Sequence, residues 1–269
     1  MSPRNKISLV IGLVLLVAIL SFLLSWPVRT IQVQWWRLDL TIEVTAPWFL
    51  GLLLAAVVAV ESDSLVREHP GAVNASLAYA LTFWPLPCLI TWLALPLLHQ
   101  WQNPLYWGGG VLGLVMLLAA ILMAQYNSIS WEGPAPHPAR WFLNLCGYAL
   151  TFLLYQQMLG LWSDGVRVAL AAGAIGTALS LGLLRTRQGD TGRTWLYALL
   201  TGLIMGEIGW VLSYWRAEAL LKVLFLFGSF YLATSVLQQH LVGRLTKAAL
   251  IEFAALGLAG LGAFWYLAS

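Results

Sequence analysis

Charged residues are scarce in this chain. Only 9% of its 269 residues are Asp, Glu, Lys or Arg, whereas 60% are hydrophobic. A soluble domain has about a quarter of its residues charged, so the main solvent of this surface is lipid rather than water. No polar stretch has the size of a domain, which excludes a separate nucleotide-binding, kinase or nucleic-acid-binding module. The net charge of +3 is small and scattered, so we expect no nucleic-acid partner.

Motifs that carry chemistry are missing as well. The four histidines lack the i, i+4 spacing or the neighbouring Cys that a metal site needs. No Gly-rich phosphate loop, GxSxG elbow or Asp-x-x-Asp pair occurs. Cys88 and Cys146 are expected at depths that differ by about 13 Å, too far for a disulfide. We therefore expect no metal and no cofactor, and these absences favour a non-catalytic protein.

Long apolar runs fill the chain instead. A helix needs about 20 apolar residues to cross a hydrocarbon core about 30 Å thick, and this criterion predicts nine spans. They are residues 7–28, 46–62, 74–98, 106–128, 141–162, 166–185, 194–215, 218–239 and 247–268. The second and sixth runs are the least distinct, which leaves eight to ten as the range. Short connections make sequential helices antiparallel neighbours, so residues 1–269 are expected to form one polytopic transmembrane domain.

Basic residues predict the orientation, because cytoplasmic loops are enriched in Lys and Arg. With the N-terminus inside, nine of them fall on the cytoplasmic side: Arg4, Lys6, Arg67, Arg140, Arg185, Arg187, Arg193, Arg244 and Lys247. Four fall outside: Arg29, Arg37, Arg167 and Arg216. This asymmetry favours nine crossings, with a cytoplasmic N-terminus and an extracytoplasmic C-terminus. The first run is longer than the roughly 7–15-residue core of a signal peptide, so we expect it to be retained.

One stretch has a two-residue period. "QVQWWRLDLTIEVTAP", residues 32–47, alternates polar with apolar side chains between the first two spans. Open strand edges are not tolerated in hydrocarbon, so this β-like segment is expected on the outer membrane surface, where residues 30–35 and 38–45 can pair as a hairpin. A structural cap, a docking edge for another protein and an interfacial helix are the alternatives. The candidate docking residues are Gln34, Trp35, Trp36, Arg37, Asp39 and Glu43.

Glu207 is the clearest candidate for a functional residue. It lies well inside the run 194–215, where burying a charge costs several kcal/mol by most scales. Lys222, in the next run, can extend toward it from the same side, and Gln156 and Gln157 add polar groups to the run 141–162. These four residues form a candidate intramembrane polar site. A structural ion pair, a protonated Glu hydrogen-bonded between helices, a proton- or cation-coupled site and a catalytic acid all fit this pattern.

A second candidate site lies at the predicted cytoplasmic rim. It comprises Glu61, Asp63 and His69, near the end of the second run, and Glu252, early in the last. Asp63 and Arg67 have the i, i+4 spacing of a surface ion pair. The alternatives are a solvated helix end with an interfacial salt bridge, and a cation site.

Proline and small residues predict two features of shape. Three prolines in "FWPLPCLITWLALPLL" must kink or interrupt the third span. Small residues recur at helical spacing in the sixth span and favour close helix contacts, either internal or with another subunit. These residues are Ala172, Gly173, Gly176 and Thr177.

Several of these features together resemble an uncharacterised family of small bacterial polytopic membrane proteins. They are Pro47 opening the second run, its end at "SLVREHP", the following "WPLPCLITWLALP" and a final quartet of helices. The resemblance covers most of the chain and implies the cytoplasmic (inner) membrane of a bacterium. It brings no known activity and no functional residues.

The sequence therefore predicts an all-α integral membrane protein of about nine helices with a short extracytoplasmic β-like segment. The predicted function is a non-catalytic subunit or scaffold of a larger membrane assembly, with lipid and other membrane protein subunits as partners. One alternative is a proton- or cation-coupled small-solute transporter centred on Glu207. The other is a membrane-embedded lipid-modifying enzyme that uses Glu207 or the group of Glu61, Asp63 and His69.

The orientation can be tested by labelling the two chain ends with a membrane-impermeant reagent. An odd number of crossings predicts that tags on Met1 and Ser269 react from opposite sides of the membrane. Reaction of both tags from the same side would mean an even number of crossings and would reverse the assigned side of part of the chain.

Overall fold

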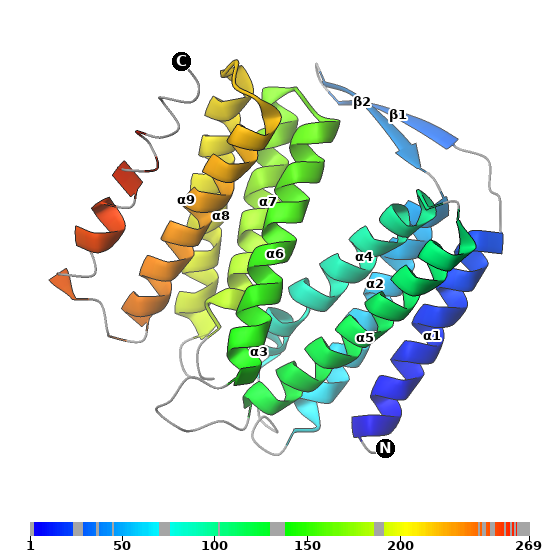
Figure 1. Ribbon diagram of the computed structural model, residues 1–269. Coiled ribbons are helices and arrows are strands. Elements are labelled where there is room, and N and C mark those ends of the chain that lie inside the picture. The colour runs from blue at the N-terminus through cyan, green and yellow to red at the C-terminus, as the bar shows by residue number, and fades with distance from the viewer. Residues whose placement is uncertain are drawn as a thin grey trace. The chain divides into compact units, whose positions relative to one another are not determined.

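The computed structural model describes most of the chain (Figure 1). The described residues are 3–23, 29–35, 38–44, 46–69, 76–101, 103–129, 138–185, 191–241, 243, 246–247, 251–255, 257–258, 260 and 262. Their helices are α1 (Pro3–Leu23), α2 (Ala46–Arg67), α3 (Leu77–Ala80), the 3₁₀ turn η2 (Leu81–Phe83), α4 (Pro85–His99), α5 (Pro104–Ile129), α6 (Pro138–Leu161), α7 (Gly165–Leu183), α8 (Thr191–Tyr214) and α9 (Ala219–Leu241). Two strands, β1 (Arg29–Trp35) and β2 (Leu38–Val44), complete them.

Six helices in the described part are long and apolar enough to cross a membrane. They are Pro47–Arg67, Leu77–His99, Pro104–Ile129, Gly165–Leu183, Thr191–Tyr214 and Ala219–Leu241. Each matches a predicted run, and a multi-pass helical membrane protein is thus confirmed. Helices α1 and α6 cover most of runs 7–28 and 141–162 but are not among these six. In α1 the described apolar helix covers only Ile7–Leu23, and residues 24–28 lie outside the described part. Most of the predicted run 247–268 lies outside the described residues.

The chain divides into two compact units. Unit 1 comprises Met1–Asn74 and Pro87–Arg140, and unit 2 comprises Ala75–Leu86 and Trp141–Ser269. The predicted single domain over residues 1–269 stays a prediction, because two compact units are not by themselves two domains that fold independently.

In unit 1, α1 packs against α2 and α5. Val10, Val14 and Ala18 repeat every four residues and are buried, which gives α1 one apolar face toward its neighbours. Close approach of α2 and α4 requires a glycine, because a Cβ at Gly51 would lie 3.0 Å from the carbonyl oxygen of Trp92. Beyond its predicted end at residue 62, α2 continues to Arg67. Ser62 is buried within it and donates to the Val58 carbonyl at 2.8 Å.

Most of the stretch with the two-residue period lies in a two-stranded antiparallel ribbon of β1 and β2. Its register pairs Arg29 with Val44 at one end and Trp35 with Leu38 at the other. Both strands are seven residues long, and they pair although the sequence has no Asn-Gly or Asp-Gly turn signal between them.

The prolines interrupt the helix Leu77–His99, as the sequence predicts. The chain leaves α3, passes through the 3₁₀ turn η2 and begins α4 at Pro85, a position where proline fits because the first turn of a helix needs no intrahelical N–H bond. Pro96 lies inside α4. The two ends of this broken helix belong to different units. Within unit 2, the indole N–H of Trp195 donates a hydrogen bond to the Ala78 carbonyl of α3 at 3.1 Å.

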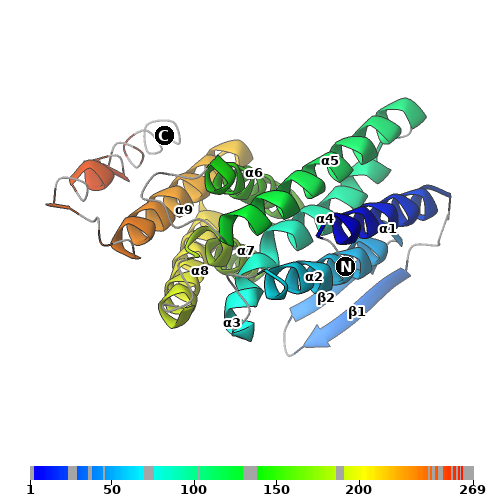
Figure 2. The ribbon, with the colours of Figure 1, turned by 90° about the horizontal axis from the view of Figure 1, so that it is seen from below.

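Unit 2 is built around the contact between α7 and α8, which lie side by side in both views (Figures 1 and 2). A Cβ at Gly202 would lie 2.6 Å from the carbonyl oxygen of Gly173 and would overlap Thr177 Oγ1. A Cβ at Gly173 would in turn lie 3.1 Å from the Gly202 oxygen. The sequence allows the small residues of the sixth span to contact either another helix of the chain or another subunit. In the structure they form a contact within the chain. We call this contact the glycine seam.

Helix α9 packs against α8 and α7, and its side chains also contact aromatic residues of α6. Tyr148 shares a hydrogen bond with Thr234, with 3.2 Å between the two hydroxyl oxygens. The rings of Tyr155 and Phe230 meet edge to face with centroids 6.3 Å apart. Both Tyr155 and Phe230 are fully buried, so this aromatic contact is part of the core of unit 2.

The glycine seam predicts a sharp difference between two Gly→Ala variants. Gly202→Ala should lower the free energy of unfolding by about 1–3 kcal/mol, the usual cost of overpacking. Gly228→Ala is the matched control, since a Cβ at Gly228 meets nothing within 4 Å, and it should leave stability unchanged or raise it slightly. Unfolding by sodium dodecyl sulfate, followed by circular dichroism, measures both. Equal stability of the two variants would contradict the seam.

Candidate functional site

Glu207 lies on the face of α8 that points away from the glycine seam. Met205 is fully buried, and two residues further along a helix correspond to a rotation of about 200°. The side chain of Glu207 is accordingly exposed. Large exposed apolar side chains surround it on the same face, which we call the outer face of α8. They are Leu196, Leu199, Leu200, Leu203, Ile204, Trp210, Val211 and Tyr214.

The carboxyl group sits at hydrocarbon depth if α8 crosses the membrane. With 24 residues, α8 is about 36 Å long, and Glu207 lies about 7 Å from its middle at about 1.5 Å per residue. A hydrocarbon core about 30 Å thick extends about 15 Å to either side of its centre. The outer face of α8 therefore combines a lipid-compatible surface with one ionisable group that lipid does not solvate.

Lys222 takes part in a different feature of unit 2. It lines a pocket with a volume of about 140 Å³. The other lining residues are Leu159, Trp162, Ser163, Val168, Ser213, Ala217 and Ala219. Glu207 does not line this pocket, and within the described residues Lys222 and Glu207 form no ion pair. The predicted intramembrane polar site is thus divided between two places.

The tandem glutamines of α6 lie apart from both places. Gln156 is exposed and Gln157 is half-buried, as expected for neighbours about 100° apart on a helix. Neither lines the pocket, although Leu159, two residues after Gln157, does.

At the rim of unit 1, the ion pair expected from the sequence is confirmed. Arg67 Nε lies 2.7 Å from Asp63 Oδ2. The other carboxylate oxygen, Asp63 Oδ1, is buried and has no hydrogen-bond partner among the described residues. Glu61, two residues earlier on the same helix, is half-buried. Glu252 is exposed and belongs to unit 2.

His69 differs from this solvated rim, since it is buried with only 6% of its surface exposed. Its ring meets the ring of Tyr126 edge to face at 4.6 Å between centroids. Burial lowers the pKa of His69 because the charged imidazolium loses its hydration. No group of three or more His, Cys, Asp or Glu that can hold a metal ion occurs in the described part of the chain.

Four of the six candidate docking residues lie on the β-ribbon. Gln34 pairs with Asp39, and Trp35 with Leu38. Glu43 pairs with Thr30. Trp36 and Arg37 lie outside the described residues.

The pocket is the feature that sequence reasoning missed. Its residues come from four helix ends and two connections, and no single run of sequence contains them. One feature of the sequence could have indicated the pocket, since serine and tryptophan cluster where two helices end. They are Trp162 and Ser163 after α6, and Ser213 and Trp215 at the end of α8. Arg185 is likewise only a loop charge in the sequence, whereas its guanidinium lies 3.8 Å from the centre of the Phe83 ring.

No curated protein and no solved structure matches the chain. A family model matches residues 26–267, and its description is "Protein of unknown function (DUF5656)".

The lowered pKa of His69 predicts a pH-dependent stability. Neutral His69 is favoured in the folded state, and the unfolded residue titrates near pH 6.5, so its stabilising effect is present above that pH and is lost as pH falls through the folded pKa. His69→Phe keeps a ring against Tyr126 and should reduce the loss of thermal stability between pH 7.5 and pH 5. His99→Phe, at the exposed end of α4, should keep the wild-type profile. Identical profiles for wild type and His69→Phe would contradict this role of His69.

Proposed function

The chain belongs to the DUF5656 family of proteins of unknown function, and we propose that it is a non-catalytic integral subunit of a larger membrane assembly. The observation that carries the proposal is the exposed carboxyl group of Glu207 on the outer face of α8. This face is proposed to be covered by a transmembrane helix of another protein.

The cost of leaving Glu207 in lipid supports this proposal. Ionised residues at the centre of a spanning helix cost about 2.5–3.5 kcal/mol on insertion scales, and they almost always face a bundle interior or a water-filled cavity. Glu207 does neither within the part of the chain that the structure describes, since it is exposed and lies outside the pocket. A partner that supplies a cation or a hydrogen-bond donor would remove this cost.

The dimensions of the outer face agree with a helix as the occupant. From Leu196 to Tyr214 it extends over about 27 Å at about 1.5 Å per residue, which is close to the thickness of the hydrocarbon core. Leu203 is 63% exposed and Val211 62% exposed, one turn to either side of Glu207. A partner helix lying along these side chains would bring its own polar residue opposite Glu207. Charge complementarity assigns that residue as Lys or Arg.

Two other functions remain proposals without a supporting contact. A transporter centred on Glu207 needs a polar cavity that reaches this residue, and the pocket of unit 2 does not include Glu207. A lipid-modifying enzyme needs convergent polar groups, and Asp63 is already paired with Arg67 while His69 packs on Tyr126. The geometry therefore supports a subunit best.

The membrane and the orientation belong to the same proposal. We propose the bacterial cytoplasmic membrane, nine crossings and a cytoplasmic N-terminus, on the basis of the family resemblance and of the Lys and Arg distribution. The β-ribbon and the connection that contains Arg216 are then extracytoplasmic. Each strand of a two-stranded ribbon has one edge that the other strand does not pair, which is a further surface suited to another subunit.

Site-specific photo-crosslinking in the native cell tests the subunit proposal. A photoreactive residue at Leu203 or Val211 should give an adduct with one defined membrane protein, whose contact segment contains Lys or Arg inside a span. Glu207→Leu should reduce the adduct at least about tenfold, the effect of losing one charge-assisted contact. The same probe at Leu170 of α7, which is 70% exposed and has no acidic neighbour on its face, is the control and should react with lipid only.

Three results would contradict the proposal. One is reaction of all three positions with lipid alone. Another is an adduct whose yield is independent of Glu207. The third is cross-linking confined to the chain itself, which would show that Glu207 is covered intramolecularly.

A further inference from the structure

The pocket of unit 2 lies where four helix ends meet. Helix α6 ends at Leu161 and α7 begins at Gly165, while α8 ends at Tyr214 and α9 begins at Ala219. Its volume of about 140 Å³ exceeds the roughly 30 Å³ that one water molecule occupies in the liquid. It is well below the roughly 300 Å³ of the smallest typical pockets for drug-sized ligands. The pocket therefore suits a group of a few atoms.

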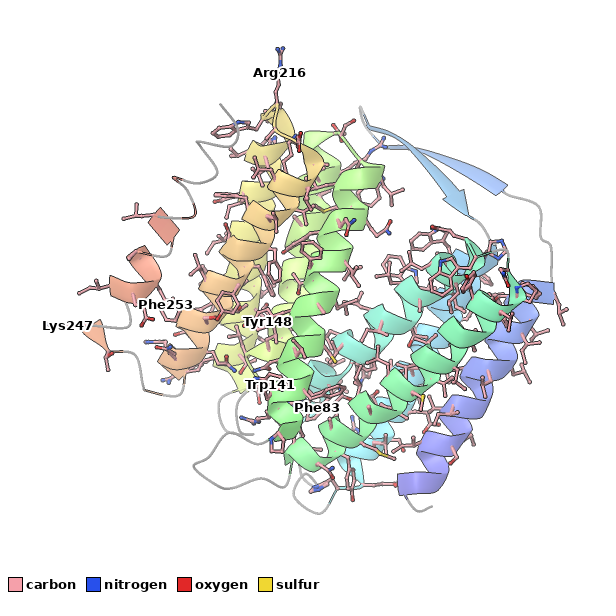
Figure 3. All side chains as sticks on the ribbon, in the orientation of Figure 1. Phe83, Trp141, Tyr148, Arg216, Lys247 and Phe253 are labelled. Atoms are coloured by element: carbon pink, nitrogen blue, oxygen red, sulfur yellow. The ribbon has the colours of Figure 1, made fainter. Side chains whose placement is uncertain are left out.

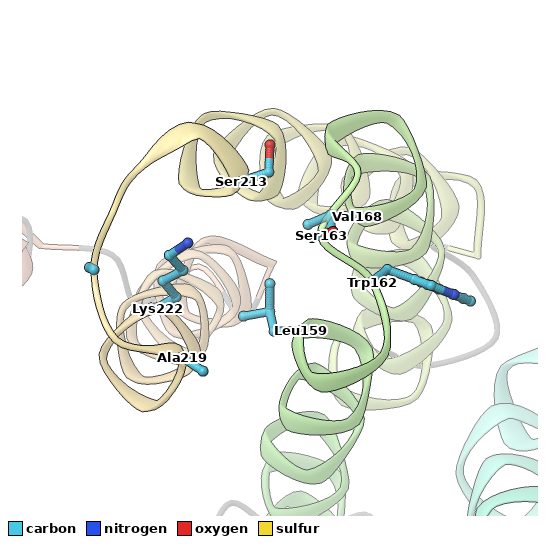
Figure 4. Close-up of a pocket in the computed structure, with 8 residues that line it drawn as sticks. Leu159, Trp162, Ser163, Val168, Ser213, Ala219 and Lys222 are labelled. Carbon is cyan, nitrogen blue, oxygen red and sulfur yellow. The ribbon is translucent and has the colours of Figure 1, made fainter. Parts of the chain in front are cut away.

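Lys222 is the one charged residue among the lining residues. Figure 4 shows its amino end pointing into the space between Leu159 and Ser213. Within the described residues, Lys222 forms no ion pair, and this includes Glu218, four residues earlier. The carboxylate of Asp164, which follows the lining residue Ser163, accepts a hydrogen bond from the Arg167 N–H and lies 3.8 Å from the Arg167 guanidinium. An ammonium group that faces a pocket without an anion favours an anionic ligand.

Other polar groups of the wall favour the same kind of ligand. The first turn of α9 begins at Ala219, and the Lys222 N–H is bonded to the Glu218 carbonyl at 3.1 Å. The N–H groups of residues 219–221 come before this bond and have no intrahelical acceptor. Ala219 lines the pocket, so the first turn of α9, with its free N–H donors and the positive end of the helix dipole, lies at the pocket wall. The hydroxyl of Ser213 already donates to the Trp210 carbonyl at 2.6 Å. Of the two serines that line the pocket, Ser163 is therefore the one that can donate its hydroxyl to a ligand.

The neighbouring residues place the pocket at the level of lipid headgroups. Trp162 lines the pocket and is 40% exposed, and tryptophan prefers the membrane–water interface. Arg216 lies on the connection after α8, where its side chain extends away from the helices (Figure 3). The apolar lining, including Leu159 and Val168, continues from this level toward the interior of the unit.

We propose that this pocket binds the phosphate group of a membrane phospholipid. Lys222 neutralises the phosphate, the first turn of α9 and Ser163 donate hydrogen bonds to it, and the acyl chains lie along the outside of unit 2. The ligand site is independent of the proposed docking of another subunit on Glu207, because the two residues lie in different places on the unit.

Lipid binding to the purified full chain in dodecyl maltoside tests this site by native mass spectrometry. The probes are dioleoyl-phosphatidylglycerol, dioleoylglycerol, which has the same tails without the phosphate, and inorganic phosphate. Lys222→Gln should weaken phosphatidylglycerol binding about tenfold or more, since it removes a charge-assisted hydrogen bond. Lys222→Arg should stay within about threefold of wild type because it keeps the charge.

Arg216→Gln is the matched control, because it removes one positive charge from the neighbouring connection but not from the pocket. It should change binding less than about twofold, as expected for a solvated surface charge. Equal binding by wild type and Lys222→Gln would overturn the proposal, and so would dioleoylglycerol binding as tightly as phosphatidylglycerol. Binding of inorganic phosphate at least as tight as that of the lipid, lost in Lys222→Gln, would overturn the assignment to a lipid.

Discussion

The close contact between α7 and α8 determines what the rest of unit 2 can do. In lipid, helices gain little from burying apolar surface against one another, so contact through small residues decides which faces meet. Gly173 of α7 and Gly202 of α8 approach until neither position has room for a side chain. Once these faces are joined, the opposite face of α8 is fixed as an outer one. Glu207 lies on that face because it follows the buried Met205 by two residues.

The same contact separates two polar groups for which the sequence predicts neighbouring depths. Lys222 opens onto the pocket at the ends of the helices, beside Ser213. Glu207 is left among leucines on the outer face of α8. An ion pair between them would have explained both residues as structural. Their separation is the basis of the two proposals: a partner that supplies a hydrogen-bond donor or a cation to Glu207, and an anionic headgroup that binds Lys222.

Much of the architecture can be predicted from hydropathy, since length and apolar content suffice to find six spans, and Pro85 marks the break before α4. The small residues around Gly173 also predict a close contact. The sequence does not show which face of α8 packs against α7. Both the seam face and the outer face of α8 are apolar, so the sequence is equally compatible with Glu207 in the interior of the unit. The pocket is beyond reach for a related reason, because its wall depends on how four helix ends converge.

A nitroxide scan of α8 in the purified chain, reconstituted in phosphatidylcholine vesicles, tests the orientation of this helix most directly. If the outer face of α8 points toward lipid, the collision rate with oxygen should oscillate with a period of about 3.6 residues. It should be high for labels at Leu203, Glu207 and Val211, and low at Ala198, Met205 and Leu212, which are buried. The contradicting result is a label at Glu207 that is shielded from oxygen but collides freely with a water-soluble nickel complex. That result would place Glu207 in a water-filled cavity rather than on a face toward lipid.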